Sequence, residues 1–390
     1  MSVLVVGASA AGLTTVEALR RKGYREPITV LGAEWHPPYD RPPLSKQFLC
    51  GDWDEARTRL RPDAMLSALD ADFVLGDPAV ALDAERRVVR TAADRALTAD
   101  AVVIATGLTP RRLLGPELEG VHVLRTLDDA AALRKDLLVA DRVVVVGDGV
   151  LGAEIAATAR NLGRQVTLAG PQTFLLESQL GPVVGALLGE LHRAEGVDLR
   201  LGTAVTGLTG LTGLTGLTGL TGVDGRVRGV QLADGEVLPA DVVVVALGAA
   251  PATGWLEGSG LRLDNGVVCD AHCRAADGIY AAGDVARWQH DDSLVRLENR
   301  TNATEQALCV AANILGDEQP YRPIPYFWTD QFTVKLQVHG RPTADAEVTV
   351  AEGNIADGRF VAHYRRGDRL VAVLGWNMPK QTRLHREHLV

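Results

Sequence analysis

The sequence predicts an α/β protein with two doubly wound parallel-sheet domains and a small C-terminal α+β domain. Two glycine-rich turns, each between a Val-rich strand and an apolar helix, predict the two sheet domains. The chain has 390 residues, which is enough for two or three domains with full cores. From about residue 324 the pattern changes to short alternating runs, which are typical of a small antiparallel sheet.

The first glycine turn lies in the stretch from Val3 to Gly12, which reads VLVVGASAAG. Gly7 permits a tight turn, and Gly12 lets the following helix pack close to the strand. The unpaired N–H groups at the start of that helix favour a phosphate or pyrophosphate. The usual pattern is G-x-G-x-x-G, and Ser9 stands at its middle glycine. Taken alone, this turn fits a plain strand-to-helix turn of any doubly wound sheet equally well.

A second copy of the turn strengthens the interpretation. The stretch from Arg142 to Glu154 reads RVVVVGDGVLGAE, with Gly147, Gly149 and Gly152 all in place. Two such turns in one chain, each after a Val-rich strand, predict a protein that binds two dinucleotides.

The composition predicts a globular enzyme. Hydrophobic residues make up 46% of the chain and charged residues 23%, as in ordinary globular proteins. A net charge of −9 argues against nucleic acid as a main partner, and it leaves an acidic protein partner open because docking depends on local patches. No apolar run approaches the roughly 20 residues that span a bilayer, and no basic targeting segment precedes the first strand. We therefore expect a cytoplasmic protein without a membrane segment.

The four cysteines predict ordinary reduced thiols. No C-x-x-C motif occurs, and Cys269 and Cys273, with His272 between them, lack the second ligand pair of a zinc site. We expect no metal site. No dithiol pair lies near the first glycine turn to relay electrons.

Two candidate cofactor contacts follow the first helix, which runs to about Arg21. Residues 28–31 form the second strand, and Glu34 is the nearest acid after it for a ribose 2′-hydroxyl, although a solvated loop carboxylate is an equal alternative. Residues 36–46 read HPPYDRPPLSK, whose four prolines predict a stiff extended segment. This segment is either a rigid surface loop or, as we favour, a frame that points Arg41 and Lys46 at a cofactor.

Two further strands predict where the chain passes between the sheet domains. Residues 102–107 and 242–248 each read as an apolar strand, a small-residue turn and then a proline, so we place boundaries near residues 112 and 238. Between them, residues 165–168 form the second strand of the second glycine-turn unit. Gly170 and Pro171 follow, where an NAD site usually carries an acid, and no Arg cluster indicates an NADP site.

The stretch 206–222 is a low-complexity tract in which the triplet TGL recurs. A period of three fits neither a strand nor a helix. We interpret the tract as an expanded, mobile and functionally neutral hairpin tip between strands around Val205 and residues 227–232, with a solenoid turn as a remote alternative.

The remaining elements complete the predicted architecture. Residues 278–284 read GIYAAGD, a short strand that ends in a small turn and a carboxylate. Residues 304–315 predict a helix with Asn302 or Thr301 as its N-cap, and its dipole would favour an anionic ligand group. The C-terminal runs 333–338, 346–350, 359–364 and 370–374 predict the antiparallel sheet.

Taken in order, these motifs resemble those of the flavoprotein ferredoxin reductases of bacterial monooxygenase and Rieske dioxygenase systems, and of rubredoxin and putidaredoxin reductases. They are the N-terminal turn, PPYDRPPLSK, ATG before Pro110, GDGVLGAE, GIYAAGD, Asn302-Ala303 and PYFWTDQ. The resemblance implies two Rossmann-like dinucleotide-binding domains in a glutathione-reductase-like arrangement. It assigns residues 1–112 and 238–323 to an FAD-binding domain, 113–237 to an NAD(P)H-binding domain and 324–390 to a C-terminal interface domain.

The resemblance also implies the site residues. Lys46, Glu154 and Trp328 would be catalytic, with Lys46 and Glu154 paired near the flavin and nicotinamide and Trp328 on the acceptor side. The implied FAD contacts are Gly7, Ser9, Ala10, Ala11, Gly12, Glu34, Arg41, Lys46, Ala105, Thr106, Gly107, Gly283, Asp284, Asn302 and Trp328. The implied NAD contacts are Gly147, Gly149, Val150, Leu151, Gly152, Glu154 and Gly248.

The implied function is electron transfer from NAD(P)H, with NADH favoured, through FAD to a ferredoxin of the 2Fe-2S type that serves a cytochrome P450 or a Rieske oxygenase. The protein would be a monomer or a homodimer. The alternatives are an NAD(P)H oxidase or peroxidase and a flavin-dependent redox sensor of the apoptosis-inducing-factor type.

Two positions depart from the family pattern. Gly170 replaces the usual Glu at a strand end, and Arg300 stands where the family tends to carry Trp, where it would raise the flavin potential or contact an acidic partner.

Overall fold

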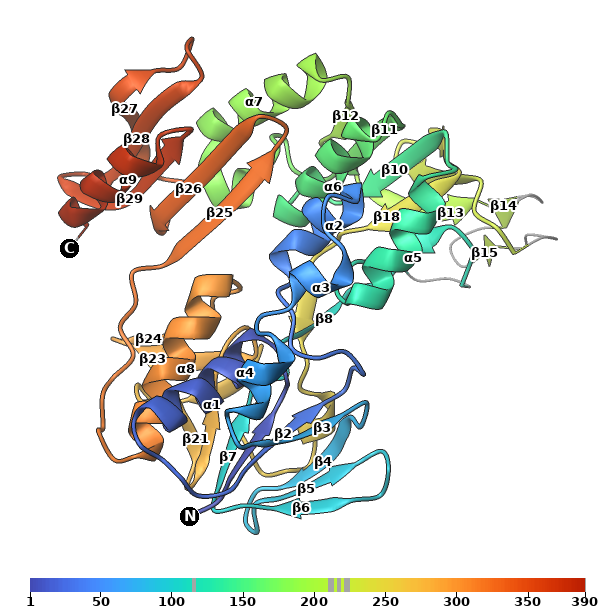
Figure 1. The fold of residues 1–390 in the computed structure, drawn as a ribbon. Helices are drawn as coiled ribbons and strands as arrows, with labels where there is room; N and C mark the ends of the chain where they lie inside the picture. The colour runs from blue at the N-terminus through green and yellow to red at the C-terminus, as the bar shows by residue number, and fades with distance from the viewer. Residues whose placement is uncertain (114–116, 210–213, 216–218, 221–224, 390) are drawn as a thin grey trace. The chain divides into compact units, whose positions relative to one another are not determined.

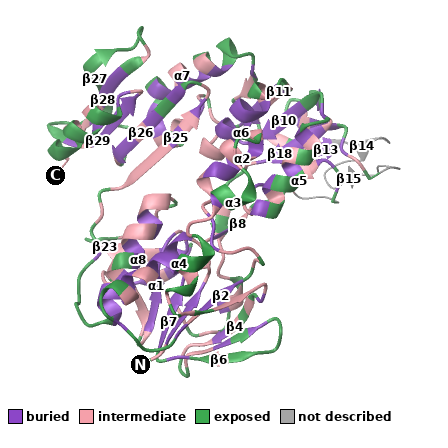
Figure 2. Cartoon of the chain, in the orientation of Figure 1, coloured by how far each residue is buried: buried purple, intermediate pink, exposed green. Residues whose placement is uncertain are grey.

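A computed structural model describes residues 1–113, 117–209, 214–215, 219–220 and 225–389. The chain forms two compact units, and it passes between them several times. The first unit contains Met1–Asp40, Ala56–Thr109 and Ala250–Pro325, and the second contains Arg41–Glu55, Pro110–Ala249 and Tyr326–Val390. Figure 2 shows that buried residues are concentrated in the central strands of each sheet, as expected for strands covered on both faces.

The first unit is built on a six-stranded sheet (Figure 1). All neighbouring strands in it are parallel except the β21–β22 edge pair. Helices α1 and α8 pack against each other. The sheet order is β21 (Arg274–Ala276), β22 (Ile279–Ala281), β7 (Ala101–Ile104), β1 (Val3–Val6), β2 (Ile28–Gly32) and β3 (Asp72–Leu75), with α1 at Ala10–Arg21 and α8 at Arg300–Ile314.

The first unit also contains smaller elements. One three-stranded sheet contains β4 (Ala79–Asp83), β5 (Val88–Thr91) and β6 (Ala96–Thr98), and another contains β20 (Val267–Cys269), β23 (Ala286–His290) and β24 (Ser293–Val295). The remaining elements are α4 (Asp63–Ser67) and η2 (Gly254–Leu256), with α3 (Glu55–Thr58), β8 (Leu108–Pro110) and β19 (Ala249–Pro251) where the chain passes between units.

The second unit contains a five-stranded, fully parallel sheet. Its order is β12 (Asp198–Leu201), β11 (Gln165–Gly170), β10 (Arg142–Val146), β18 (Val242–Val245) and β9 (Val121–His122). Three helices connect strands of this sheet or flank it in the sequence, namely α5 (Leu127–Leu137), α6 (Val150–Asn161) and α7 (Glu177–Ala194). Each unit therefore contains a fully or mostly parallel sheet in which a glycine turn follows one strand, β1 or β10, and this confirms the predicted α/β fold class.

A hairpin flanks the threonine–glycine–leucine tract, as predicted. Strand β13 (Val205–Thr209) pairs antiparallel with β16 (Gly229–Leu232), which pairs with β17 (Val237–Pro239). Within the tract, β14 (Leu214–Thr215) pairs with β15 (Gly219–Leu220). The prediction of a mobile tip falls largely on residues 210–213, 216–218 and 221–224, which lie outside the described residues.

The prediction of an extended proline segment is wrong. Residues Pro42–Ser45 form a 3₁₀ turn, η1, and Gln47–Cys50 form a short helix, α2. Pro42 and Pro43 occupy the first positions of the turn, where the fixed φ of proline suits a helical turn and its missing N–H has no intrahelical partner to lose. The prolines therefore stiffen a turn instead of an extended segment.

The C-terminal part forms the predicted antiparallel sheet, which belongs to the second unit. The FWTDQ stretch contributes an additional strand that the alternation pattern did not indicate. The order is β25 (Tyr326–Gln331), β26 (Val334–Gly340), β29 (Arg369–Trp376), β28 (Arg359–Arg366) and β27 (Glu347–Asn354), followed by α9 (Pro379–His385) and η3 (Arg386–His388).

The predicted N-cap of the last helix of the first unit is also wrong. Helix α8 begins at Arg300, and Asn299 is its N-cap residue. Asn302 lies inside the first turn, where its amide donates to the carbonyl of Leu297 (3.3 Å) and its Oδ1 accepts from the Tyr321 hydroxyl (3.0 Å). Asn302 is therefore held by tertiary contacts and does not cap the helix.

Helix α7 and the C-terminal sheet are joined by buried polar contacts. The Nε2 of His192 lies 2.8 Å from Oε1 of Gln331, and the Tyr364 hydroxyl donates to the Leu180 carbonyl (2.8 Å). His192 is fully buried and its Nδ1 has no partner. Burial disfavours the charged imidazole and lowers the pKa of His192 to about 4.

This histidine predicts acid sensitivity. In the unfolded chain His192 binds a proton near pH 6.5, whereas in the folded chain its pKa is about 4. The folded state therefore has its full stability above pH 6.5 and loses stability as the pH falls from 6.5 to 4. The loss reaches about 1.4 kcal/mol for each pH unit within this range. Urea unfolding of the wild type and His192→Gln, followed by far-UV circular dichroism at several pH values, measures it. An identical pH slope for both proteins would contradict the assignment.

Candidate functional site

The first glycine turn has the close packing that its residues predict. Gly7 has a φ of +121°, and a Cβ there would lie 2.2 Å from the carbonyl oxygen of Ala105. A Cβ on Gly12 would lie 1.8 Å from the carbonyl oxygen of Gly7. Ser9 is the N-cap of α1 but makes no side-chain cap hydrogen bond, and the first turn contains no acidic residue. The N–H groups at the start of α1 thus lack a side-chain anion of their own, which suits a bound phosphate.

Two other predicted turns of the first unit lie at the same edge of the sheet. Ala105, Thr106 and Gly107 follow β7, and the Thr106 hydroxyl donates to the carbonyl of Ala252 (3.0 Å). Gly283 follows β22, and its N–H donates to Oε1 of Gln306 (2.8 Å). Since β1, β7 and β22 are parallel neighbours, their carboxyl ends bring these turns together, as at a nucleotide-binding edge.

A Cβ on Gly283 would lie 3.2 Å from the Cβ of Ala11, which places the turn after β22 directly beside α1. Asp284 follows, and its carbonyl accepts from the Arg296 guanidinium (3.1 Å). Asn299 Oδ1 and Arg296 Nε are buried without a partner. Buried polar atoms normally have partners, so these orphaned groups fit a site for a polar ligand such as FAD.

Glu34 is already engaged in a contact within the first unit. It is half-buried, and one of its carboxylate oxygens accepts a hydrogen bond from the Tyr39 hydroxyl. This bond orients the carboxylate after β2. Its predicted role toward a ribose remains a prediction.

The second glycine turn repeats the packing of the first. Gly147 has a φ of +128°, and its Cβ would lie 2.3 Å from the Ala246 carbonyl oxygen. A Cβ on Gly152 would lie 1.9 Å from the Gly147 carbonyl oxygen. Gly149, the N-cap of α6, is different, because a Cβ there would meet nothing within 4 Å. Open space therefore adjoins the start of α6, which fits a dinucleotide phosphate.

The remaining predicted NAD contacts lie at neighbouring positions of the second unit. Val150 and Leu151 are the first residues of α6 and are half-buried. Gly248 follows β18 with a φ of +82°, and its carbonyl accepts from the N–H of Arg111 (3.0 Å).

The second unit also contains the predicted pair of charged residues. Lys46 Nζ lies 2.7 Å from Oε2 of Glu154, and the two side chains are only 11% and 7% exposed. Oε2 also accepts from the Ser45 hydroxyl (2.5 Å), and Oε1 accepts from the Thr329 hydroxyl (2.8 Å). One carboxylate on α6 thus holds both the proline turn and strand β25. The sequence indicated the pair, whereas Ser45 and Thr329 were missed because no motif distinguishes a buried hydroxyl.

The polar contacts continue beyond Thr329. The Gln331 amide donates to the Thr329 hydroxyl oxygen (3.2 Å), and Gln331 is also the partner of His192. Trp328, which directly precedes Thr329 on β25, is half-buried and stacks on Tyr326 with ring centroids 6.0 Å apart. The alternation of β25 buries Thr329 and Gln331 and leaves Trp328 partly accessible.

Two arginines that the sequence singled out have partners within their own units. The Arg41 guanidinium donates to the carbonyl of Arg125 (2.5 Å) in the second unit. In the first unit, Arg300 Nε lies 2.5 Å from Asp40 Oδ1, and its guanidinium also donates to the Thr304 hydroxyl. These contacts fix Arg300 locally, and its predicted influence on a flavin remains a prediction.

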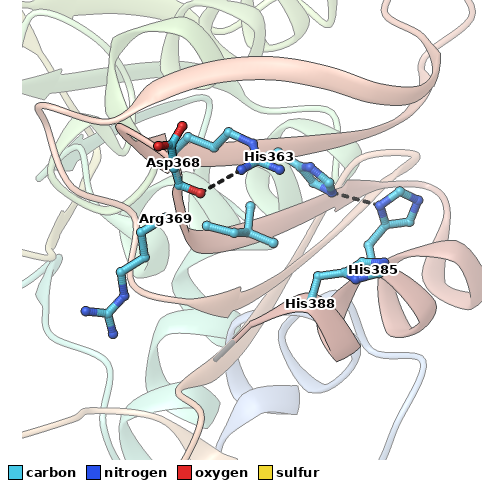
Figure 3. Close-up of a pocket in the computed structure, with 7 residues that line it drawn as sticks. His363, Asp368, Arg369, His385 and His388 are labelled. Atoms are coloured by element: carbon cyan, nitrogen blue, oxygen red, sulfur yellow. Dashed lines mark hydrogen bonds between the residues drawn. The ribbon is translucent and has the colours of Figure 1, made fainter.

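The predicted site residues thus form two groups, one in each unit. Neither group lines the pocket in Figure 3, a cavity of about 760 Å³ in the C-terminal part. His363, His385 and His388 line that pocket together with Arg365, Asp368, Arg369 and Leu370. His363 Nε2 lies 2.7 Å from His385 Nδ1 (Figure 3), and burial lowers the pKa of His363.

All four cysteines are free thiols, as predicted. In the ranges that the structure describes, no group of three or more His, Cys, Asp or Glu side chains could hold a metal ion. No helix in those ranges is both long and apolar enough to cross a membrane.

The fold and the two glycine turns define a class of pyridine-nucleotide enzyme, and comparison with known proteins agrees. The family model described as pyridine nucleotide-disulphide oxidoreductase matches residues 1–307, and a model described as reductase C-terminal matches residues 326–389. The chain belongs to the pyridine nucleotide-disulphide oxidoreductase family, and it is an oxidoreductase.

Its relatives place it among the ferredoxin reductases of that family. It is 35% identical over 385 residues to rhodocoxin reductase of Rhodococcus erythropolis, covering 97% of this chain and 87% of the relative. It is 38% identical over 383 residues to the anthranilate 1,2-dioxygenase system ferredoxin–NAD(+) reductase component of Burkholderia cepacia, covering 96% and 90%.

A solved structure of a reductase bound to its ferredoxin partner is also similar to this chain. The crystal structure of the covalent putidaredoxin reductase–putidaredoxin complex matches with a TM-score of 0.90 and 34% identity, covering 99% of this chain and 92% of that chain. These comparisons confirm the resemblance stated above and the predicted cofactor classes, FAD and a pyridine nucleotide.

The glycine geometry predicts stability losses of different size for two similar substitutions. Gly152→Ala forces a methyl against a backbone oxygen, so we expect a stability loss of about 2 kcal/mol or more. Gly149→Ala places its methyl in open space, so we expect a loss below about 1 kcal/mol but weaker nucleotide binding. Chemical unfolding and calorimetric titration with NAD⁺ measure the two effects. Equal stability losses would contradict the steric argument.

The buried pair predicts strong coupling between its two partners. Lys46→Met or Glu154→Gln leaves one buried group without its counter-ion, and we expect each to lose about 3 kcal/mol of unfolding free energy. The double variant contains no orphaned charge, so its loss is smaller than the sum of the single losses. Urea unfolding of the four proteins gives the coupling energy. Additive losses would show that the two side chains do not stabilise each other.

Proposed function

We propose that this protein transfers electrons from NADH through FAD to a ferredoxin of the 2Fe-2S type that serves a cytochrome P450 or a Rieske oxygenase. The observation that carries the proposal is the pair of matching glycine turns, one at the sheet edge of each unit. Relatives named as ferredoxin–NAD(+) reductase components of dioxygenase systems, and a solved reductase–putidaredoxin complex, support the choice of acceptor.

The proposal gives each glycine turn one nucleotide. Gly7, Ser9 and Gly12 would approach the FAD pyrophosphate, with the groups after β7 and β22 along the rest of the molecule. Gly147, Gly149 and Gly152 would approach the nicotinamide dinucleotide. When bound, the flavin supplies the conversion of one hydride into two single-electron transfers.

The buried pair of Lys46 and Glu154 in the second unit would hold these two side chains in fixed positions. Glu154 accepts from Lys46, Ser45 and Thr329, so its carboxylate is fixed and Lys46 cannot swing away without breaking a buried contact. We propose that Lys46 lies near the flavin ring and Glu154 near the nicotinamide, where a fixed geometry lowers the cost of aligning the reacting atoms. Trp328, accessible beside buried Thr329, would face the acceptor.

A cytoplasmic location is part of the proposal. All four cysteines are free, as is typical of a reducing compartment.

The proposal predicts a yellow protein that NADH reduces faster than NADPH. We expect a ratio of reduction rates of about tenfold or more, equivalent to about 1.4 kcal/mol. Anaerobic stopped-flow absorbance of the flavin band, with each nucleotide in turn, measures the ratio. A purified protein that stays colourless when supplied with FAD would refute the proposal.

The acceptor is tested separately. The protein reduced with NADH is mixed with a 2Fe-2S ferredoxin or with air-saturated buffer, and reoxidation is followed. Faster reoxidation by the ferredoxin supports the reductase. Faster reoxidation by oxygen would instead indicate an oxidase.

A further inference from the structure

Strand β11 ends at Gly170, beside the carboxylate of Asp148. A Cβ on Gly170 would lie 2.3 Å from Oδ2 and 2.4 Å from Cγ of Asp148. Asp148 belongs to the second glycine turn, between Gly147 and Gly149. The carboxylate thus comes from the turn after β10, yet it occupies the space that a side chain at the end of β11 would enter.

The position of this carboxylate is fixed by Gln172. The backbone N–H of Gln172 donates to Oδ2 (2.7 Å), and its side-chain amide donates to Oδ1 (2.6 Å). Gln172 is itself held, because its Oε1 accepts from the N–H of Ser178 (2.7 Å). Asp148 is only 5% exposed. Each carboxylate oxygen still has a lone pair for one further donor.

The end of this strand is where doubly wound folds bind the adenosine ribose. An acid there usually accepts from the ribose 2′-hydroxyl of NAD, and an Arg nearby accommodates the 2′-phosphate of NADP. Here the strand end has no side chain, and the acid next to it comes from the neighbouring turn. Gly170 and Asp148 are therefore complementary, since a larger residue at 170 would displace the carboxylate.

We propose that Asp148 is the specificity-determining residue that recognises the adenosine ribose of NADH and disfavours the 2′-phosphate of NADPH. The inference rests on the proposed function and names the residue that sets its nucleotide preference.

The surrounding charges favour the same nucleotide. No Lys or Arg occurs between Gln165 and Leu191. The nearest further charge along the chain is Glu177, whose carboxylate accepts from the N–H groups of Thr173 (3.0 Å) and Phe174 (3.1 Å). The segment after β11 thus supplies no cation of its own for a phosphate dianion, and Arg200 on the neighbouring strand β12 is already paired with Asp198 (3.0 Å) and Glu236 (3.4 Å).

The test compares how tightly the wild type and variants at Asp148 and Gly170 bind the two nucleotides. Calorimetric titrations of the flavin-loaded protein with NAD⁺ and with NADP⁺ give the ratio of the two dissociation constants, independently of turnover. For the wild type we expect NAD⁺ to bind at least about tenfold more tightly than NADP⁺. Asp148→Asn and Asp148→Gly should each reduce the ratio about tenfold, mainly by weakening NAD⁺ binding.

Two further variants complete the design. Gly170→Glu alone should lower the melting temperature and weaken both nucleotides, because the new side chain collides with Asp148. Asp148→Gly combined with Gly170→Glu removes the collision and should restore the NAD⁺ preference. Glu177→Gln is the matched control, which also removes one carboxylate from this segment, and it should change the ratio less than about twofold.

The outcomes separate this inference from the proposed function. If the wild type binds neither nucleotide, the proposed function fails. If the wild type prefers NAD⁺ and both Asp148 variants keep the wild-type ratio with unchanged melting temperature, only the inference fails, and Asp148 is a structural anchor for Gln172. A wild type that prefers NADP⁺ would overturn the inference directly.

Discussion

The carboxylate of Glu154 is the interaction on which the second unit depends. It accepts from Lys46 and Ser45 on one side and from Thr329 on the other, so a single helix position joins the proline turn, the parallel sheet and the C-terminal sheet. These segments are more than 100 residues apart in the sequence. A buried ion pair adds little net stability compared with apolar packing, but it becomes costly when one partner is lost. These contacts restrict how the segments can be arranged, because a rearrangement that separates Lys46 from Glu154 would leave a buried charge without its partner.

Packing of the backbone imposes the second constraint. In both units the helix after the glycine turn lies so close to that turn that a single methyl group on Gly12 or Gly152 would collide with a carbonyl oxygen. A Cβ on Gly7 or Gly147 would collide instead with the carbonyl oxygen of Ala105 or Ala246, so packing requires glycine at two of the three fingerprint positions in each unit. The middle position is not constrained by packing in the second unit, since Gly149 faces open space. Ser9 at the corresponding place of the first turn shows that the fold accepts a side chain there.

The sequence predicted features that follow from steric rules and periodicity. The glycine turns, the parallel strands and the four alternating C-terminal runs were predictable, as was the partnership of Lys46 and Glu154 from the resemblance to a family. The sequence alone did not predict features that depend on contacts between segments far apart in the chain. The proline segment was expected to be extended, yet its prolines start a 3₁₀ turn. Asn302 was expected to cap a helix, but it is held by Leu297 and Tyr321. Asp148 gave no signal, because the proximity of its carboxylate to Gly170 arises only when two strands lie side by side.

The hairpin of β13 and β16 has a consequence for the repeated tract that it flanks. Val205, which pairs with Leu232, lies outside the repeat and has no identical residue one triplet away. Val205 therefore fixes the register in which β13 pairs with β16, although the residues that follow Val205 recur every three positions. Gaining or losing whole triplets would leave the same residues in the stem and change only the enclosed span, and doubling that span costs only about 0.6 kcal/mol of closure entropy. The tract is thus a place where the chain can gain or lose whole triplets while the pairing of the stem is kept.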